Sequence, residues 1–385
     1  MSRTRFLSTL LAVTMVLAAA TGVGAAETFK VGVVGPRTGP VATYGLSVIN
    51  AVTLAVEELN AAGGVLGRQI ELIVEDNKAD ATETNNAFRK LISRDQVHAI
   101  IGAVVTANSI VGAQVAQMMK VPMITPTSTA EKVTQEGDYI FRSCLIDPVQ
   151  GRIMANFAYN SLEVREIACL TAQSNDYSVG LEEVFTKTFE ELGGKVVASE
   201  SYSEGDQDFK AQLTKIRAKK PEAIYVPGYY TEAGLIARQM RQLGMDLPIL
   251  GPDGFDSPKL FEIGGDAVFG SYFTNHYSVE TEDEVSLRFV DSYRAKFGHD
   301  PDGFGALGYD AALILFDAIE RAGDAALAKN VATARVAIRD ALAGTKNINV
   351  VTGTLTLDEN RNPIKSAVIL KVVDGGYEFV ERIDP

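Results

Sequence analysis

The stretch from Phe29 to Val74 decides the fold. It begins with the apolar run FKVGVV (Phe29 to Val34), continues with the helix-like segment NAVTLAVEELNAA (Asn50 to Ala62) and ends with IELIV (Ile70 to Val74). Short apolar runs of this length are typical of buried strands, and the middle segment has the apolar spacing of an amphipathic helix. Gly63 and Gly64 then stop that helix. A strand, a helix and a second strand in this order predict a parallel sheet.

The same alternation extends outward along the chain in two series. In the first series we predict further helices and strands at Thr82 to Arg94, Ala99 to Ile101, Ser109 to Met119 and Pro122 to Ile124. The second series has predicted strands at Glu166 to Leu170, Lys195 to Ser199, Ala223 to Val226 and Pro248 to Leu250, with helices at Val179 to Leu192, Phe209 to Lys219 and Glu232 to Leu243. Two α/β units are therefore expected, with a crossing near Ile140 to Asp147. Glu282 to Leu342 is largely helical in pattern, and Thr352 to Arg382 has strand-like segments around the turn Asp374-Gly375-Gly376.

The N-terminus has the pattern of a secretory signal peptide. Arg3 and Arg5 precede an apolar run from Phe6 to Ala20, and small residues follow at Gly24-Ala25-Ala26. The alternative is a membrane anchor, but the run falls short of the roughly 20 residues that a spanning helix needs. We expect cleavage after Ala26, which leaves 359 of the 385 residues. No later stretch resembles a membrane span, so a soluble periplasmic protein is predicted.

Charge and cysteine content exclude several classes of protein. The formal net charge is −13, and removal of Arg3 and Arg5 with the signal peptide makes it −15. Such a surface repels nucleic acid and anionic lipid. Cys144 and Cys169 are too few for a disulfide framework. At this stage a bridge between them and two free thiols are both open.

Catalytic and cofactor motifs are missing or out of context. Gly303 to Gly308 spells GxGxxG, but it follows a polar stretch instead of a strand, so close helix packing explains its glycines better than a dinucleotide does. The histidines His98, His276 and His299 lack the spacing of a zinc site. No nucleophile elbow and no phosphate loop occur. The sequence therefore predicts binding without metal, cofactor or catalysis.

Three loops that follow predicted strands are rich in hydroxyl groups: Thr38 to Tyr44, Thr106 to Ser109 and Thr125 to Thr129. In open α/β sheets, ligands bind beyond the carboxyl ends of the strands, where helix N-termini present free amides. Thr106 stands directly before a predicted helix, and Ser128-Thr129-Ala130-Glu131 has the form of a capping box. Helix capping and ligand binding are both open for these residues, and they are compatible.

Fragments in a particular order carry a family resemblance. They are Val31 to Gly35, GPVATYG (Gly39 to Gly45), Leu59 to Val65, Glu75 to Asn77, Ile100 to Gly102, ITPTST (Ile124 to Thr129), Phe141-Arg142, PGYYTEAG (Pro227 to Gly234) and GPDGFDSP (Gly251 to Pro258). Together they resemble the branched-chain amino-acid (Leu/Ile/Val) binding proteins of ABC transporters, in the type I periplasmic binding protein family. The resemblance covers nearly the whole chain after the signal peptide.

The resemblance implies two Rossmann-like parallel-sheet lobes joined by a three-segment hinge, with ligand held between them. Matched to this chain, the N-terminal lobe spans 27–143 and 276–350, and the C-terminal lobe spans 144–275 and 351–385. It also implies a set of binding residues for an amino-acid zwitterion: Tyr44, Val104, Val105, Thr106, Thr127, Ser128, Thr129, Tyr177, Tyr229 and Asp253.

The implied roles divide by charge. The ligand carboxylate meets the amide and hydroxyl of Thr106 and the backbone of Thr129, with Tyr229 nearby. The ammonium meets the Thr127 carbonyl, the Thr129 hydroxyl and Asp253. The remaining residues of the set shape the side-chain pocket. The family often has Glu where Asp253 stands, so the acid here is one methylene shorter.

The function implied is that of a monomeric periplasmic protein that binds leucine, isoleucine or valine and delivers it to the permease of an ABC importer. A sensory binding protein on the same fold is an alternative, as is binding of another amino acid or an aromatic carboxylate. An enzyme is disfavoured because no catalytic group of residues is found.

Overall fold

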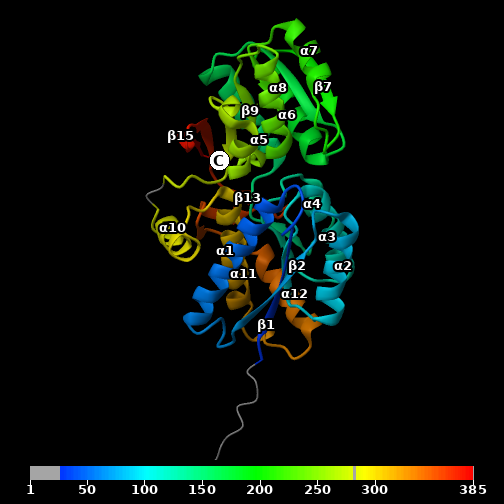
Figure 1. The fold of residues 1–385 in the computed structure, drawn as a ribbon. Coiled ribbons are helices and arrows are strands. Elements are labelled where there is room, and N and C mark those ends of the chain that lie inside the picture. Colours follow the sequence, from blue (N-terminus) through cyan, green and yellow to red (C-terminus); the bar gives the residue numbers. More distant parts are fainter. Residues whose placement is uncertain (1–26, 281–282, 385) are drawn as a thin grey trace, which may run out of the picture.

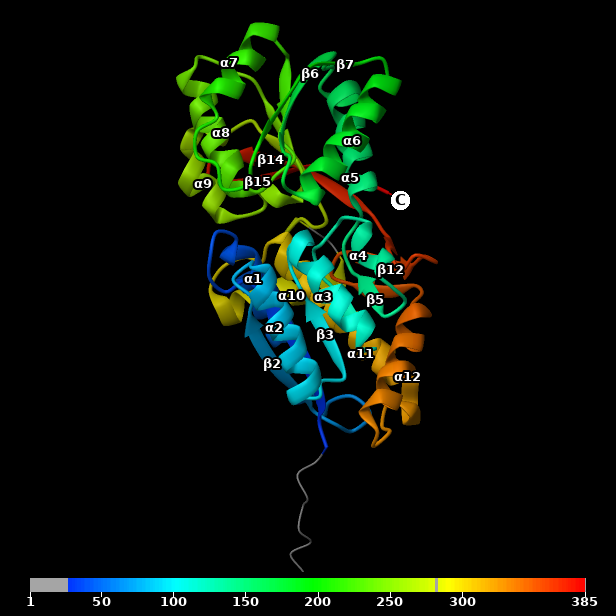
Figure 2. The ribbon, with the colours of Figure 1, turned by 90° about the vertical axis from the view of Figure 1, so that its right-hand side faces the viewer.

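Two α/β lobes lie one above the other in the computed structural model, which describes residues 27–280 and 283–384 (Figures 1 and 2). The predicted signal peptide falls outside the described residues. Within the described part of the chain, no helix is long and apolar enough to cross a membrane.

The lower lobe in Figure 1 is built on a five-stranded sheet whose strands all run parallel, in the order β2-β1-β3-β4-β5. Its strands are β1 (Phe29–Gly35), β2 (Ile70–Asp76), β3 (Ala99–Gly102), β4 (Met123–Thr125) and β5 (Ile140–Arg142). Its helices are α1 (Ala42–Ala61), α2 (Ala81–Arg89) with a π-helical turn η1 (Lys90–Arg94), α3 (Thr106–Met118) and α4 (Lys132–Gln135), joined later in the chain by α10 (Glu284–Phe297), α11 (Gly303–Ala322), η5 (Gly323–Ala325) and α12 (Val331–Ala343). The first predicted series is thus confirmed as one lobe.

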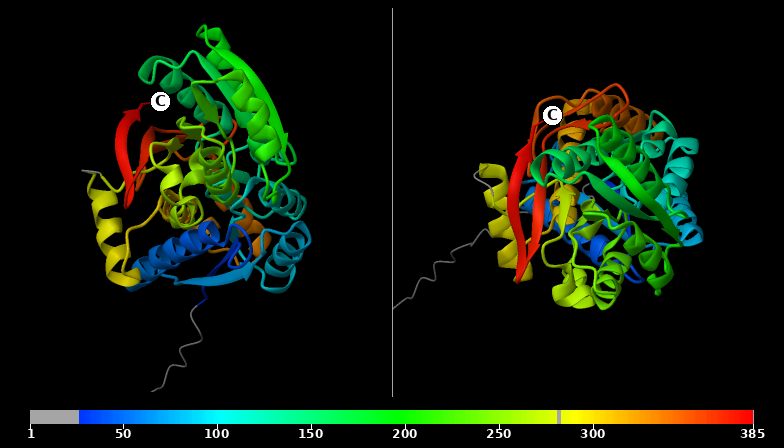
Figure 3. Two further views of the ribbon diagram at one scale, coloured as in Figure 1. Left: turned by 45° about the horizontal axis from the view of Figure 1, so that its top comes forward. Right: turned by 90° about the horizontal axis from the view of Figure 1, so that it is seen from above.

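The upper lobe is built on a seven-stranded sheet in the order β15-β14-β10-β9-β8-β6-β7. Its strands are β6 (Glu166–Ala172), β7 (Lys195–Tyr202), β8 (Ala223–Tyr225), β9 (Ile249–Gly251), β10 (Tyr272–Asn275), β14 (Ala367–Val373) and β15 (Gly376–Ile383). Its helices are α5 (Asp147–Asn156), η2 (Phe157–Ser161), α6 (Asp176–Glu191), α7 (Lys210–Lys219), α8 (Tyr230–Gln242), η3 (Asp253–Phe255), α9 (Pro258–Gly264) and η4 (Gly265–Val268). The pairs β10–β14 and β14–β15 are antiparallel, and the other pairs in this sheet are parallel. Figure 3 shows β14 and β15, in red, along one edge of the lobe.

The chain crosses between the lobes three times: after β5, after β10 and before β14. This confirms the predicted α/β fold with two lobes and a three-segment hinge. A small sheet of β11 (Ile348–Val350), β12 (Gly353–Leu357) and β13 (Pro363–Ile364) precedes the last crossing.

The predicted lobe boundaries at 143, 275 and 350 stay a prediction. In the segment after β12, Arg361 donates hydrogen bonds to the carbonyls of Thr134 and Ile140 in the lower lobe. Buried Lys365 donates to the Ser143 carbonyl at 3.0 Å and to the Thr352 hydroxyl at 2.6 Å. These contacts favour a third crossing near Lys365 instead of 351.

Several helices begin earlier than predicted. The helix expected at Asn50 starts at Ala42, the one expected at Ser109 starts at Thr106, and the one expected at Val179 starts at Asp176. The missed turns contain Thr, Ser, Asn, Asp or Gly, which favour caps and loops in isolation. The first turn of α1 packs closely against Pro36, and only glycine fits there. A Cβ at Gly45 would lie 2.0 Å from the Pro36 carbonyl oxygen.

The two cysteines are free and buried, which settles the alternative that the sequence left open. The Cys144 thiol lies 3.3 Å from the Ser128 carbonyl, and Cys169 lies 3.9 Å from the Thr186 hydroxyl. Burial raises the pKa of the Cys144 thiol to about 12. Neither cysteine is therefore a ready nucleophile at neutral pH.

Candidate ligand-binding site

Most of the predicted site residues surround one small cavity between the lobes. It is lined by residues that follow β3, β4, β6, β8 and β9, namely Val104, Val105, Thr106, Thr127, Thr129, Tyr177, Tyr229, Asp253 and Gly254, and by Phe304 near the start of α11. The cavity measures about 10 Å³, room for roughly one water molecule. The lobes are therefore closed on the site, and any larger ligand requires them to part or the lining to move.

The lower-lobe wall of the cavity offers groups that favour an anion. Thr106 is the first residue of α3, so the amides of the first turn have no partner within the helix. Among the described residues, its hydroxyl makes no hydrogen bond, and the buried Thr129 hydroxyl is also unpartnered. Thr127 is already engaged, because its hydroxyl donates to the Val104 carbonyl at 2.6 Å.

The capping interpretation of these hydroxyls is wrong. The residue that precedes α3 is Val105, and no side chain caps this helix. α4 begins only at Lys132, so Ser128 is too far from it to cap. Instead the Ser128 hydroxyl donates to the Val104 carbonyl at 3.0 Å and lies 2.6 Å from the Ser109 hydroxyl. Ser128 thus braces the neighbouring loop and does not line the cavity.

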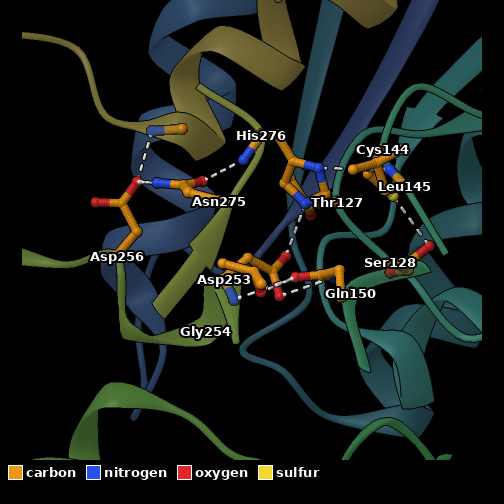
Figure 4. A network of polar contacts seen from close by, with 12 residues as sticks. Thr127, Ser128, Cys144, Leu145, Gln150, Asp253, Gly254, Asp256, Asn275 and His276 are labelled. Carbon is orange, nitrogen blue, oxygen red and sulfur yellow. Dashed lines mark hydrogen bonds and ion pairs between the residues drawn. The ribbon is translucent and has the colours of Figure 1, made fainter. Parts of the chain in front are cut away.

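The upper-lobe wall centres on Asp253, which is 2% exposed. Its Oδ1 accepts hydrogen bonds from the Tyr177 hydroxyl at 2.6 Å and from Gln150 Nε2 at 3.2 Å. Its Oδ2 lies 3.1 Å from His276 Nε2 (Figure 4). Three donors therefore satisfy this buried carboxylate.

The tautomer of His276 follows from its other nitrogen. His276 Nδ1 accepts from the Leu145 backbone amide at 3.4 Å, so Nε2 carries the proton and donates to Asp253. Burial lowers the pKa of His276, which keeps the ring neutral. His276 lies in the crossing after β10, and Leu145 lies in the crossing after β5. The hydrogen bond between them therefore connects two crossing segments directly beside Asp253.

Asp147 is a second buried acid, which the sequence analysis missed. It is the first residue of α5 and 3% exposed, and its amide donates to the Thr129 carbonyl at 3.0 Å. Both of its carboxylate oxygens lack a partner among the described residues. Burial raises its pKa well above the usual range and the carboxylate of Asp253 acts in the same direction, whereas the nearby Thr129 side chain opposes them, although its hydroxyl does not reach hydrogen-bonding geometry. Its position in a crossing segment was the only signal in the sequence.

Aromatic rings close the cavity. Tyr44 stacks on Phe304 with ring centres 4.0 Å apart, and Tyr177 stacks on Tyr229 at 5.3 Å. Tyr44 does not line the cavity itself. Its hydroxyl donates to the Gly254 carbonyl at 2.5 Å and so links the two lobes. Phe304 was missed because it lies inside the rejected glycine motif.

The glycines of that motif do serve helix packing, as predicted. A Cβ at Gly308 would lie 3.0 Å from the Val48 Cα and carbonyl oxygen on α1. A Cβ at Gly303 would lie 2.4 Å from the Asn275 side-chain oxygen. The motif therefore brings α11 close to α1 and to the second crossing.

Comparison with known proteins gives matches along nearly the whole described chain. The family described as periplasmic binding protein matches residues 28–377. The leucine-, isoleucine-, valine-, threonine- and alanine-binding protein of Pseudomonas aeruginosa is 33% identical over 303 residues, 78% of this chain and 80% of that protein.

Two crystal structures have the same fold. The leucine-binding protein LivK from Thermotoga maritima has a TM-score of 0.87 and 42% identity, over 93% of this chain and 99% of LivK. LivJ from Streptococcus pneumoniae, in complex with isoleucine, has a TM-score of 0.86 and 33% identity, over 93% of this chain and 100% of LivJ. From these matches and the two-lobed fold, the chain belongs to the periplasmic binding protein family.

Proposed function

We propose that this protein is the extracytoplasmic solute-binding component of an ABC importer, that it binds a neutral amino acid between its lobes, and that leucine, isoleucine and valine are its first candidates. The observation that carries the proposal is the division of charge across the cavity. The α3 amides and the free hydroxyls of Thr106 and Thr129 lie on one wall, and Asp253 lies on the other.

An amino acid satisfies both walls at once. Its carboxylate meets the helix amides and Thr106, and its ammonium meets Asp253 and the Thr129 hydroxyl. Asp147 lies on the same side, where its amide donates to the Thr129 carbonyl, and a ligand ammonium nearby would favour its ionised form. The rest of the proposed set is Tyr44, Val104, Val105, Thr127, Ser128, Tyr177 and Tyr229, with Tyr44 and Ser128 holding the residues that line the cavity.

Buried Asp253 also weighs against the other ligand that the sequence left open. An aromatic carboxylate brings negative charge into the cavity that Asp253 lines and offers no cation to this acid. Like charges within one small buried cavity are unfavourable. A zwitterion is therefore the better match, and other neutral amino acids rank behind the three aliphatic ones.

Delivery to a membrane permease is supported by the family and by LivJ, which is described as the substrate-binding protein of a branched-chain amino acid transporter. We infer export to the periplasm with cleavage near Ala26, a monomer, and no catalytic turnover. A sensory role on the same fold is the second candidate. It shares the ligand site, so ligand-dependent transport in cells separates the two.

The test is a thermal-shift panel on the protein that starts at Glu27, with the common amino acids and with benzoate. A ligand at about 100 times its dissociation constant adds roughly 2.7 kcal/mol of apparent stability. We expect leucine, isoleucine or valine to raise the melting temperature most, and calorimetry to give one site per chain. A shift with benzoate and none with any amino acid contradicts the proposal.

A further inference from the structure

A second cavity, of about 770 Å³, is lined by residues of both lobes, including Tyr293 of α10 and Tyr377 of β15. Figure 1 shows these two elements on the same side of the molecule. The lower lobe contributes Leu46 and Ser47 from α1 and Asp302 before α11, and the upper lobe contributes Asp256 and Tyr377. Its size falls within the range of about 300 to 1,000 Å³ that is usual for small-molecule sites.

The two cavities share a wall. Thr43, Asp256 and Gly303 line the second cavity, and their close neighbours in the chain line or close the first: Tyr44, Gly254 and Phe304. The wall thus contains one segment of the upper lobe and two of the lower lobe. Because both lobes contribute, the shape of the second cavity depends on closure.

The lining of the second cavity is rich in acidic residues. Asp256, Asp300 and Asp302 line it, and His299 is the basic residue among the described side chains of the lining, which include no lysine or arginine. Exposed Asp300 is paired with Arg294. Asp302 accepts only neutral hydrogen bonds, from Ser47 at 2.6 Å and from the Gly305 amide at 2.8 Å. Asp256 and Asp302 are therefore left without a lysine or arginine partner among the described residues, and His299 is the basic side chain nearest in charge effect to Asp302.

One carboxylate oxygen of Asp256 accepts no hydrogen bond from the described residues. Asp256 is 3% exposed, and its Oδ2 accepts from Asn275 at 2.8 Å and from the Gly303 amide at 2.7 Å. No described residue donates to Oδ1, which points away from this pair in Figure 4. Burial raises the pKa of Asp256 to about 7, and the Asp302 carboxylate adds to the effect. A cationic ligand can therefore supply the positive charge that Asp256 lacks.

Aromatic rings make up much of the remaining lining: Phe261, Tyr277, Tyr293 and Tyr377. Ring faces attract organic ammonium groups, and desolvated pairs of this kind are worth about 2 kcal/mol. A metal ion fits less well, because no group of three or more metal-ligating side chains occurs in the described residues. We propose that this cavity binds a small organic ammonium cation, with Asp256 as its buried counter-ion.

Such a cation also acts on the first site. It contacts both lobes, so it stabilises the closed arrangement and raises the affinity for the ligand in the first cavity, and the coupling is reciprocal. This second effect rests on the proposed function, whereas binding of the cation itself does not.

The first test is calorimetric titration of the protein that starts at Glu27 with choline, without any amino acid present. The neutral isostere 3,3-dimethylbutan-1-ol, which has carbon in place of the charged nitrogen, is the control. We expect choline to bind at one site and the isostere to bind at least tenfold more weakly. Absence of choline binding up to 10 mM, or equal binding of both probes, overturns the inference.

Variants locate the site. Asp256→Asn keeps the side-chain shape and removes the charge, and we expect at least a tenfold loss of choline affinity. Leu46→Lys places an ammonium at the mouth of the cavity from an exposed position, 41% exposed, that tolerates change, and it should also weaken choline. Unchanged affinity in a folded Asp256→Asn protein, or in Leu46→Lys, overturns the assignment.

A last arm separates the two cavities. Choline should still bind Asp253→Asn, which alters only the first cavity. If choline binding is lost there and kept in Asp256→Asn, the cation occupies the first cavity and the inference is wrong. If choline binds but no amino acid does, the second site stands and the proposed function fails.

Discussion

Asp253 makes the sharpest single-residue test of the first site. Asp253→Asn retains the shape but leaves a buried ligand ammonium without its counter-ion, which costs roughly 3 to 5 kcal/mol. We expect affinity for the best amino acid to fall about a hundredfold to several thousandfold by calorimetry.

Thr106→Val is the matched comparison. Its backbone amide survives, and only one charge-assisted hydrogen bond of roughly 1.5 to 3 kcal/mol is lost. The loss should therefore be smaller than for Asp253→Asn, with circular dichroism confirming that both variants fold. Near-native amino-acid affinity in Asp253→Asn would show that the ligand is not held there as a zwitterion.

We expect Asp147 to lower the stability of the ligand-free protein and to contribute to ligand binding. Folding raises the pKa of this carboxyl, so its ionisation opposes folding. Asp147 therefore lowers the free energy of unfolding increasingly as the pH rises above the ordinary pKa of 3.8. Asp147→Asn removes this penalty and should stabilise the ligand-free protein at pH 7 by about 1 to 3 kcal/mol. It should also weaken amino-acid binding.

Urea unfolding at pH 5 and pH 7 measures the effect, and the gain should be larger at pH 7. Asp246→Asn, whose side chain is 97% exposed, is the control and should change stability by less than about 0.5 kcal/mol. A less stable Asp147→Asn protein at pH 7 would mean that a cation already pairs with this acid.

At the scale of elements, the packing of α1 on α11 positions Phe304, which lines the first cavity. Tyr44 on α1 stacks on Phe304 of α11. Gly308→Val forces a side chain against the Val48 backbone and should destabilise the protein by about 1 to 3 kcal/mol. Gly305→Ala, in the same helix, meets nothing closer than 3.4 Å and should stabilise by up to about 1 kcal/mol. Equal effects in denaturant unfolding would show that the contact with α1 is not what requires glycine.

For the whole molecule, the contacts between the lobes describe a closed state. Besides Tyr44 and Gly254, the Tyr230 hydroxyl donates to the Pro40 carbonyl at 2.8 Å, and Lys132 pairs with Asp176 at 2.7 Å. A cavity of about 10 Å³ cannot admit an amino acid while these contacts hold.

We therefore expect the ligand-free protein in solution to populate a more open arrangement, and ligand to shift it toward the closed one. Small-angle scattering should show a smaller radius of gyration with leucine than without it. Tyr44→Phe removes the hydroxyl that bonds Gly254 and should leave the ligand-free radius equal or larger. An identical radius with and without a ligand that calorimetry shows to bind would rule out hinge closure.

The local features of this protein could be read from its sequence. The alternation from Phe29 to Val74 is the pattern of a parallel α/β unit, and Gly63-Gly64 marks its turn, because hydrophobic spacing and turn residues act over a few positions. The loops after strands, with Thr106 and Thr129, follow from the same reasoning, since parallel strands bring their carboxyl ends to one edge. Asp253 was predicted only through the family resemblance.

Tertiary structure alone decided how those loops meet. Tyr44 and Gly254 are 210 residues apart in the chain yet share a hydrogen bond between the lobes, and His276 reaches Asp253 because β10 and β9 are neighbours in the upper sheet. The missing partner of Asp147 is likewise invisible in a linear pattern. Burial and pairing of a charge depend on every segment packed around it, and here those segments come from both lobes.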